Sequence, residues 1–167
     1  MRKNIAFYNI EVFEMLTWAE NIAKQIIARR PDKEEYVCAA GISPSGSIHI
    51  GNFRDIATSY FVVQALRGLG KKAKLLFSWD EYDRLRKIPV NVSAVRDDME
   101  QYVGKPYCDV PNPFGNERDS ATYAEYFEKE FMESIGAFGI EMDYRYQSQM
   151  YRSGKYTDLI LQAIAKR

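Results

Sequence analysis

The sequence predicts an α/β fold in which helices flank a parallel β-sheet. Two short apolar runs, at residues 36–40 and 73–79, have the length and composition of buried strands. A loop rich in Gly and Ser, followed by a long helical repeat of apolar residues, lies between them. Strand, loop, helix and strand in this order form a βαβ unit, whose two strands run parallel with a right-handed crossover.

The composition is that of one folded domain with 167 residues and a mass of 19.4 kDa. Hydrophobic residues make up 46% and aromatic residues 14%, which is enough for a sizeable core. Lys plus Arg and Asp plus Glu both number 23, so a wholly basic nucleic-acid module is not expected. One histidine and two cysteines, Cys38 and Cys108, are too few for a disulfide scaffold or a structural zinc site.

The two ends of the sequence indicate where the protein works and whether more chain follows. Glu11 precedes any useful apolar stretch, so the N-terminus is not a signal peptide. No uncharged apolar run is long enough to span a membrane. We therefore expect a cytoplasmic protein with reduced thiols. The last residues resemble a helix that lacks a glycine cap or a polar tail, which suggests a continuation after Arg167.

The first half of the sequence gives four elements in order. A helix is predicted for residues 9–29, where apolar side chains recur with helical spacing, and the Arg-Arg-Pro at 29–31 ends it. The strand at 36–40 is an unbroken apolar run, so we expect it to be buried on both faces. A long helix starts near Ile50 and is closed by glycines before the strand at 73–79.

The second half begins with four residues, Asp-Glu-Tyr-Asp at 80–83, at the carboxyl end of the second strand. Beyond them the pattern alternates between helical spacing, irregular Pro-rich chain and period-two alternation. The elements predicted from these patterns are a short helix from residue 91 or 93 to 102, an irregular segment at 105–115, a helix at 120–135, a third strand at 139–146 and a last helix after residue 156.

Residues 41–52, Gly-Ile-Ser-Pro-Ser-Gly-Ser-Ile-His-Ile-Gly-Asn, form the loop most suited to chemistry. The loop joins a strand to a helix at the carboxyl edge of the sheet, where open α/β sheets bind ligands. Its small residues let backbone N–H groups approach phosphate oxygens, and the helix N-terminus favours an anion. His49 can donate to a phosphate, and Gly51 leaves room for an adenine or a ribose. A single histidine is often structural, but the position of this one favours a ligand contact.

The motif His49-Ile50-Gly51-Asn52 resembles the His-Ile-Gly-His signature of class I aminoacyl-tRNA synthetases. The Gly-Ile-Ser-Pro-Ser-Gly before it and the asparagine at its end resemble the class I lysyl-tRNA synthetases in particular. Further stretches resemble landmarks of that family in the same order, so the resemblance covers nearly the whole chain. They are residues 53–55, 77–89, 105–115 and 150–156.

The resemblance implies the first half of a Rossmann-like class I synthetase fold, a HUP-type parallel sheet with flanking helices. Residues 1–167 would be the N-terminal part of the catalytic domain, with residues 84–138 as a largely helical insertion. The second half of that domain and the anticodon-binding domain would be absent. The implied activity is that of a lysine–tRNA ligase, which forms lysyl-adenylate from L-lysine and ATP and transfers lysine to tRNA(Lys).

The resemblance also implies roles for individual residues. His49 and Asn52 would be catalytic, and Mg²⁺ would accompany ATP without a metal site of its own. The residues expected to contact ATP are Pro44, Ser45, Gly46, His49, Gly51 and Asn52. The residues expected to contact lysine are Gly41, Ser43, Asp80, Glu81 and Asp83. One of the three carboxylates, Asp80, Glu81 or Asp83, could instead simply pair with Arg84 or Arg86.

No Lys-Met-Ser-Lys-Ser-like loop, the second signature of class I synthetases, occurs in the 167 residues. We therefore expect the chain alone to show little lysine-dependent exchange of pyrophosphate into ATP. Two alternatives stay open. The chain could be a non-catalytic, truncated paralogue that binds nucleotide, lysine or a protein partner, or a small nucleotidyltransferase. The sequence predicts no oligomeric state.

Overall fold

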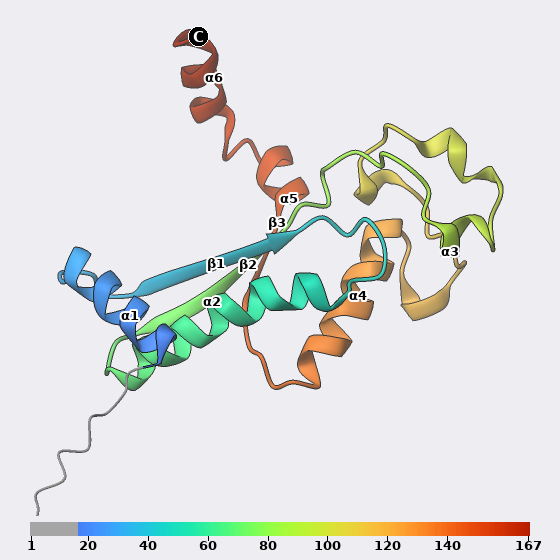
Figure 1. Cartoon of the computed structure of the whole chain (residues 1–167). Coiled ribbons are helices and arrows are strands. Elements are labelled where there is room, and N and C mark those ends of the chain that lie inside the picture. Colours follow the sequence, from blue (N-terminus) through green and yellow to red (C-terminus); the bar gives the residue numbers. More distant parts are fainter. Residues whose placement is uncertain (1–16) are drawn as a thin grey trace, which may run out of the picture.

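The computed structural model describes residues 17–167 and shows three parallel strands with flanking helices (Figure 1). β1 (Tyr36–Ile42), β2 (Ala73–Trp79) and β3 (Asp143–Tyr146) are hydrogen-bonded in the order β1-β2-β3. Both pairings are parallel, so the predicted α/β class and the parallel βαβ unit are confirmed.

The first helix packs against the second, and the second packs on β1. α1 (Trp18–Arg29) starts at Thr17, whose hydroxyl accepts a hydrogen bond from the backbone N–H of Glu20. Residues 9–16 of the predicted first helix lie outside the described residues. α2 (Ile50–Gly68) starts at His49 and is followed by Gly70, whose φ of +72° is the left-handed conformation that glycine tolerates best.

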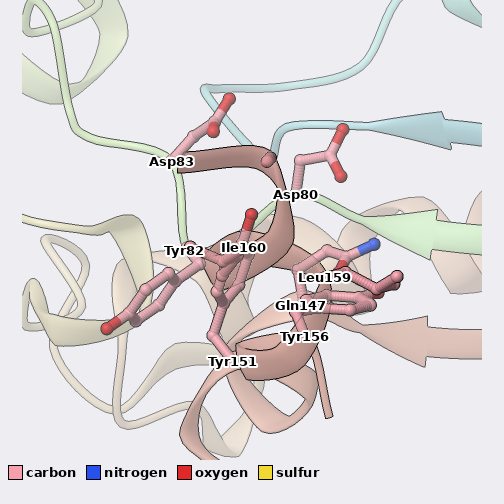
Figure 2. Close-up of a pocket in the computed structure, with 9 residues that line it drawn as sticks. Asp80, Tyr82, Asp83, Gln147, Tyr151, Tyr156, Leu159 and Ile160 are labelled. Carbon is pink, nitrogen blue, oxygen red and sulfur yellow. The ribbon is translucent and has the colours of Figure 1, made fainter. Parts of the chain in front are cut away.

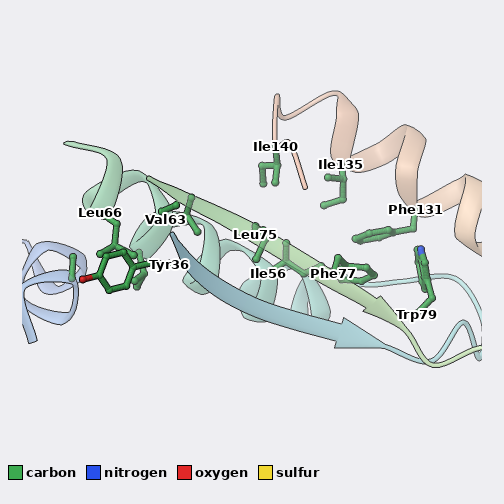
Figure 3. Close-up of a cluster of buried hydrophobic side chains, with 13 residues drawn as sticks. Tyr36, Ile56, Val63, Leu66, Leu75, Phe77, Trp79, Phe131, Ile135 and Ile140 are labelled. Carbon is green, nitrogen blue, oxygen red and sulfur yellow. The ribbon is translucent and has the colours of Figure 1, made fainter. Parts of the chain in front are cut away.

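The sheet is covered on one face by α2 and α4 (Tyr123–Gly136), which meet the buried side chains of β2 (Figure 3). Alternate β2 residues are buried, and the rings of Phe77 and Phe131 stack with centroids 5.2 Å apart. We call this cluster the first core. Its large members include Ile56, Val63, Leu66, Leu75, Phe77, Trp79, Phe131 and Ile135.

β1 is less buried than the sequence predicts. Only Tyr36 is buried along this strand, and the side chain of Val37 is 43% exposed. The expectation of burial on both faces was therefore wrong. The reason is topological, because β1 lies at the edge of the sheet formed by the described residues and packs against helices on one face.

The chain between β2 and α4 packs against the N-terminal half of α4 and forms a second core there, whereas the C-terminal half of α4 belongs to the first core. Apart from α3 (Val90–Ser93) it contains only one-turn helices, which are η1 (Asp98–Tyr102), η2 (Tyr107–Asp109) and η3 (Glu117–Asp119). The single helix predicted up to residue 102 is wrong, since α3 and η1 are separate. We call the cluster around α4 here the second core, and its members include Leu85, Val92, Met99, Tyr107, Val110, Tyr123 and Phe127.

The last third differs from the prediction at its strand. β3 begins at Asp143 instead of residue 139, because Gly139 has a φ of +66° and turns the chain. α5 (Gln147–Arg152) follows β3 directly and was not predicted. α6 (Thr157–Ala165) is the predicted last helix, and it extends away from the sheet (Figure 1).

Candidate active site

Three segments meet at the carboxyl ends of the strands, where the sequence predicts the site. They are the loop between β1 and α2, the acidic stretch after β2, and the start of α5 after β3. The backbone N–H of Asp80 donates to the carbonyl of Ile42 at 3.0 Å, which joins the first two segments. This edge of a parallel sheet is where α/β proteins bind ligands.

His49 caps the N-terminus of α2. Its Nδ1 accepts a hydrogen bond from the backbone N–H of Gly51 at 3.1 Å. A ring nitrogen that accepts carries no proton, so the proton of the neutral ring lies on Nε2. The exposed imidazole therefore offers an N–H donor beside a helix N-terminus, a combination suited to a phosphate.

The other motif residues build this helix start. Asn52 completes a capping box, since its Oδ1 accepts from the backbone N–H of His49 at 3.4 Å. A Cβ on Gly51 would lie 3.0 Å from Cε1 of His49, so glycine here gives the imidazole room. The sequence predicts that Gly51 leaves room for a nucleotide, and the structure adds a reason internal to the protein.

The loop before His49 is tied to the second core. Pro44 is buried, and the carbonyl of Ser45 accepts a hydrogen bond from the Tyr123 hydroxyl at 2.9 Å. Gly46 has ordinary contacts, with its nearest neighbour at Pro89. At the end of β1, a Cβ on Gly41 would lie 2.8 Å from the carbonyl oxygen of Ser78, so strand pairing requires glycine there.

The acidic residues after β2 divide between two sides. Asp80 and Asp83 line one cavity, and the hydroxyl of Ser43 donates to Oδ2 of Asp83 at 2.9 Å. Partial burial, together with the negative charges of Asp83 and Glu81, raises the pKa of Asp80. Within the described chain, none of the three forms an ion pair with Arg84 or Arg86.

Glu81 points away from that cavity and is only 2% exposed. Its two carboxylate oxygens accept from the backbone N–H groups of Gln147, at 3.0 Å, and Ser148, at 2.7 Å. Glu81 therefore binds the otherwise unpartnered donors of the first turn of α5. The structure does not bring Glu81 together with Asp80 and Asp83.

The cavity beside Asp80 and Asp83 has a volume of about 540 Å³ and is rich in tyrosine (Figure 2). The rings of Tyr82 and Tyr151 stack with centroids 5.2 Å apart, and Tyr156 packs edge-on against Tyr151 at 5.1 Å. Two carboxylates and aromatic faces attract an ammonium group, the carboxylates by charge and the rings by cation–π interaction. We call it the tyrosine cavity.

These tyrosines cannot be identified individually from the sequence. The resemblance covered the stretch that holds Tyr151 and Tyr156, but no spacing rule places them above Asp80. The Tyr156 hydroxyl donates to Oε1 of Gln147 at 2.8 Å, and Gln147 also lines the cavity. Gln147 is the first residue of α5, and the sequence pattern does not predict this helix. The sequence therefore gives no reason to expect Gln147 at the site.

A smaller cavity of about 250 Å³ adjoins the tyrosine cavity and shares Asp83 with it. Its lining includes the hydroxyl residues Ser43 and Ser45 and the cationic residues Arg86 and Lys87. Its cationic wall suits a carboxylate or a phosphate group. In the described part of the chain, no group of three or more His, Cys, Asp or Glu side chains is placed to hold a metal ion.

The family profile described as "tRNA synthetases class I (K)" matches residues 16–167. The chain belongs to this family. It is 42% identical over 153 residues to a lysine–tRNA ligase of Pyrococcus horikoshii, which covers 92% of this chain and 28% of the relative. It is 45% identical over 152 residues to a lysine–tRNA ligase of Treponema pallidum, with 91% and 28% covered.

Membership of this class I synthetase family agrees with both the parallel sheet and the motif loop before α2. The chain spans about 28% of the length of the curated relatives that it matches. The recognised family agrees with the resemblance drawn from residues 41–52 and from the later landmarks. Among the described residues, no helix combines the length and apolarity needed to cross a membrane.

Proposed function

We propose that this chain provides the lysine-contacting and ATP-contacting half of a lysine–tRNA ligase active site. In the full reaction, the lysine carboxylate attacks the α-phosphate of ATP, and pyrophosphate leaves. A hydroxyl of tRNA(Lys) then attacks the lysyl carbonyl, and AMP leaves. The observation that carries the proposal is that the loop leading to the histidine-capped start of α2 is joined to the acidic stretch after β2, through the hydrogen bond from the Ser43 hydroxyl to Asp83 at 2.9 Å.

For ATP, we assign the phosphates to the N-terminus of α2. Nε2–H of His49 and the backbone N–H of Gly46 would donate to phosphate oxygens, while the N–H of Ser45 donates to the carbonyl of Ser43. Asn52 acts by holding His49 through the capping box. Mg²⁺ would arrive with the nucleotide, because phosphate oxygens supply most of the ligands that the ion prefers.

For lysine, we assign the α-ammonium group to Asp80 and Asp83. Ser43 orients Asp83 through its hydrogen bond, and Gly41 lets the strand end come close. The lysine carboxylate would lie toward α2, where it can meet the α-phosphate in line. We place this activity in the cytoplasm, where tRNA is charged.

The lysine assignment is tested by calorimetric titration of the 167-residue chain with L-lysine. Asp83→Asn keeps the shape but loses the charge, so we expect the affinity to fall about tenfold, as for a charge-assisted hydrogen bond. Asp32→Asn, a remote surface carboxylate, should leave the affinity unchanged. Equal affinities for the Asp83 variant and the unmodified chain would contradict the assignment.

The ATP assignment is tested with His49→Asn. Asparagine is a good N-cap, so α2 should remain folded, but the Nε2 donor is lost. We expect affinity for ATP with Mg²⁺ to fall about five- to tenfold, the value of one hydrogen bond to a charged group. Circular dichroism should show unchanged helix content. An ATP affinity that does not respond would move the phosphates away from His49.

A further inference from the structure

A further cavity of about 620 Å³ lies between α4, η2 and the start of α5. No residue lines both this cavity and the tyrosine cavity. The consecutive residues Asp80 and Glu81 line different cavities, Asp80 the tyrosine cavity and Glu81 this one. We call it the Glu128 cavity after the residue that makes it unusual.

Glu128 is buried within this cavity wall without a partner. Its side chain is 4% exposed, it forms no hydrogen bond or ion pair in the described chain, and its Oε1 has no partner. A buried carboxyl group without a partner costs free energy, because it has lost water and gained nothing in return. An unpartnered acceptor in a cavity indicates a missing donor.

The neighbouring charges do not supply that donor. Arg152 pairs with Asp109 at 2.6 Å, and Nζ of Lys129 donates to the carbonyls of Arg118 and Asp119. The neighbouring acids are engaged too. Glu81 accepts from α5, and Oε2 of Glu125 accepts from the backbone N–H of Ala121 at 2.8 Å. Glu128 is the acid of this wall that has no partner in the described chain; its Oε1 is closed to solvent, so a ligand donates to it once the carboxyl group turns toward the cavity.

The rest of the wall selects the kind of donor. Ala124, Met132 and the ring of Tyr146 present apolar surface next to the carboxyl groups of Glu125 and Glu128. A metal ion would need several ligands around one point, and the described residues offer no such cluster. An alkyl chain with a cationic end matches an apolar wall with an acid at its base.

We propose that the Glu128 cavity binds a small aliphatic amine, whose ammonium group donates to Glu128 while its alkyl chain packs against Met132 and Tyr146. The site is separate from the proposed lysine site and does not depend on the ligase activity. Glu125 lies one turn before Glu128 on α4, so a second ammonium group on the ligand would meet a second carboxylate.

Proton uptake and release give the proposal a specific signature. Burial, followed by the charges of Glu81 and Glu125, raises the pKa of Glu128 to about 8. Lys129, Cys108, Tyr146 and Arg152 are the other titratable groups that line the cavity. Because an ammonium group needs the ionised carboxylate, binding at pH 7 should release close to one proton. Affinity should then rise about tenfold per pH unit until pH 8.

The test is calorimetric titration of the 167-residue chain with 1,4-diaminobutane, in two buffers of different ionisation enthalpy. We expect saturable binding with proton release at pH 7. Glu128→Gln should lower the affinity at least about tenfold, because the charge is lost. The exposed control Glu141→Gln should not change it, and 1,4-butanediol, which has no charge, should not bind.

Two outcomes overturn the proposal. One is the absence of saturable binding at millimolar diamine. The other is binding that Asp80→Asn abolishes and Glu128→Gln does not, which would place the amine in the tyrosine cavity. If Glu128→Gln fails to fold, two other measurements test the proposal: the diamine affinity of Glu125→Gln, and the proton release of the unmodified chain. A proton is released at pH 7 only if the amine binds to a carboxyl group that was protonated before binding.

Discussion

At the scale of single residues, the direction of a side chain decides its role. Asp80 and Glu81 are consecutive after β2 and face opposite sides, one toward the tyrosine cavity and one toward the backbone of α5. The family resemblance implies that both contact lysine, and the sequence itself shows only that carboxylates follow a strand. The sequence does not reveal that both carboxylate oxygens of Glu81 accept from backbone N–H groups of α5, because its pattern does not predict α5.

Glu128 gives a prediction about pH. Its pKa, raised to about 8 by burial, lies above the ordinary value of 4.5 that the unfolded chain would have. Between these values the folded state holds a proton that the unfolded state has lost. The contribution of Glu128 to the free energy of unfolding is therefore fully present below about pH 4.5. It falls by up to about 1.4 kcal/mol per pH unit as the pH rises toward 8.

Glu128→Gln should remove that slope, because the amide does not titrate. Urea unfolding in amine-free phosphate buffer from pH 5.5 to 8.5 measures it. The free energy of unfolding of the variant should exceed that of the unmodified chain increasingly with pH. Glu141→Gln, an exposed control, should run parallel to the unmodified chain. Parallel curves for Glu128→Gln as well would show that burial does not shift this carboxyl.

At the scale of elements, the sequence predicts what local chemistry determines. α2, α4 and β2 follow from apolar spacing, from caps and from glycines, and they lie close to where they were expected. The burial of β1 depends on its place in the strand order, which no local pattern contains. The one-turn helices around η1 and η2 are fixed by packing in the second core, so periodicity did not reveal them.

Gly41 tests whether strand pairing or a ligand requires a glycine at the end of β1. A Cβ there would lie 2.8 Å from the carbonyl oxygen of Ser78, so Gly41→Ala must push β1 and β2 apart. We expect a loss of about 1–3 kcal/mol in the free energy of unfolding, the usual cost of overpacking. Urea denaturation without any ligand measures this cost.

Gly68→Ala is the matched control for that experiment. Gly68 is the last residue of α2, and a Cβ there would meet nothing within 4 Å. Stability should be unchanged or raised by about 0.5–1 kcal/mol, since alanine loses less backbone entropy in a helix. If both alanine variants behaved alike without ligand, Gly41 would be required by a ligand and not by the sheet.

At the scale of the whole molecule, α4 joins the two cores. Phe131 packs in the first core against Phe77, and Phe127, one turn earlier, packs in the second core against Tyr123. The loop before α2 adds a link, because Tyr123 donates to the carbonyl of Ser45. Both cavities beside α5 depend on this arrangement, so the site requires the second core as well as the sheet.

We therefore expect the two cores to unfold together. In a background of Trp18→Phe and Cys38→Ser, the fluorescence of buried Trp79 reports the first core, and thiol labelling of Cys108 reports the second. The two urea curves should coincide. Phe127→Ala should shift both by the same amount, about 3–5 kcal/mol, because its ring is fully buried. Labelling of Cys108 at lower urea than the change in Trp79 would mean that the second core opens alone, and α4 would then not couple the two halves of the site.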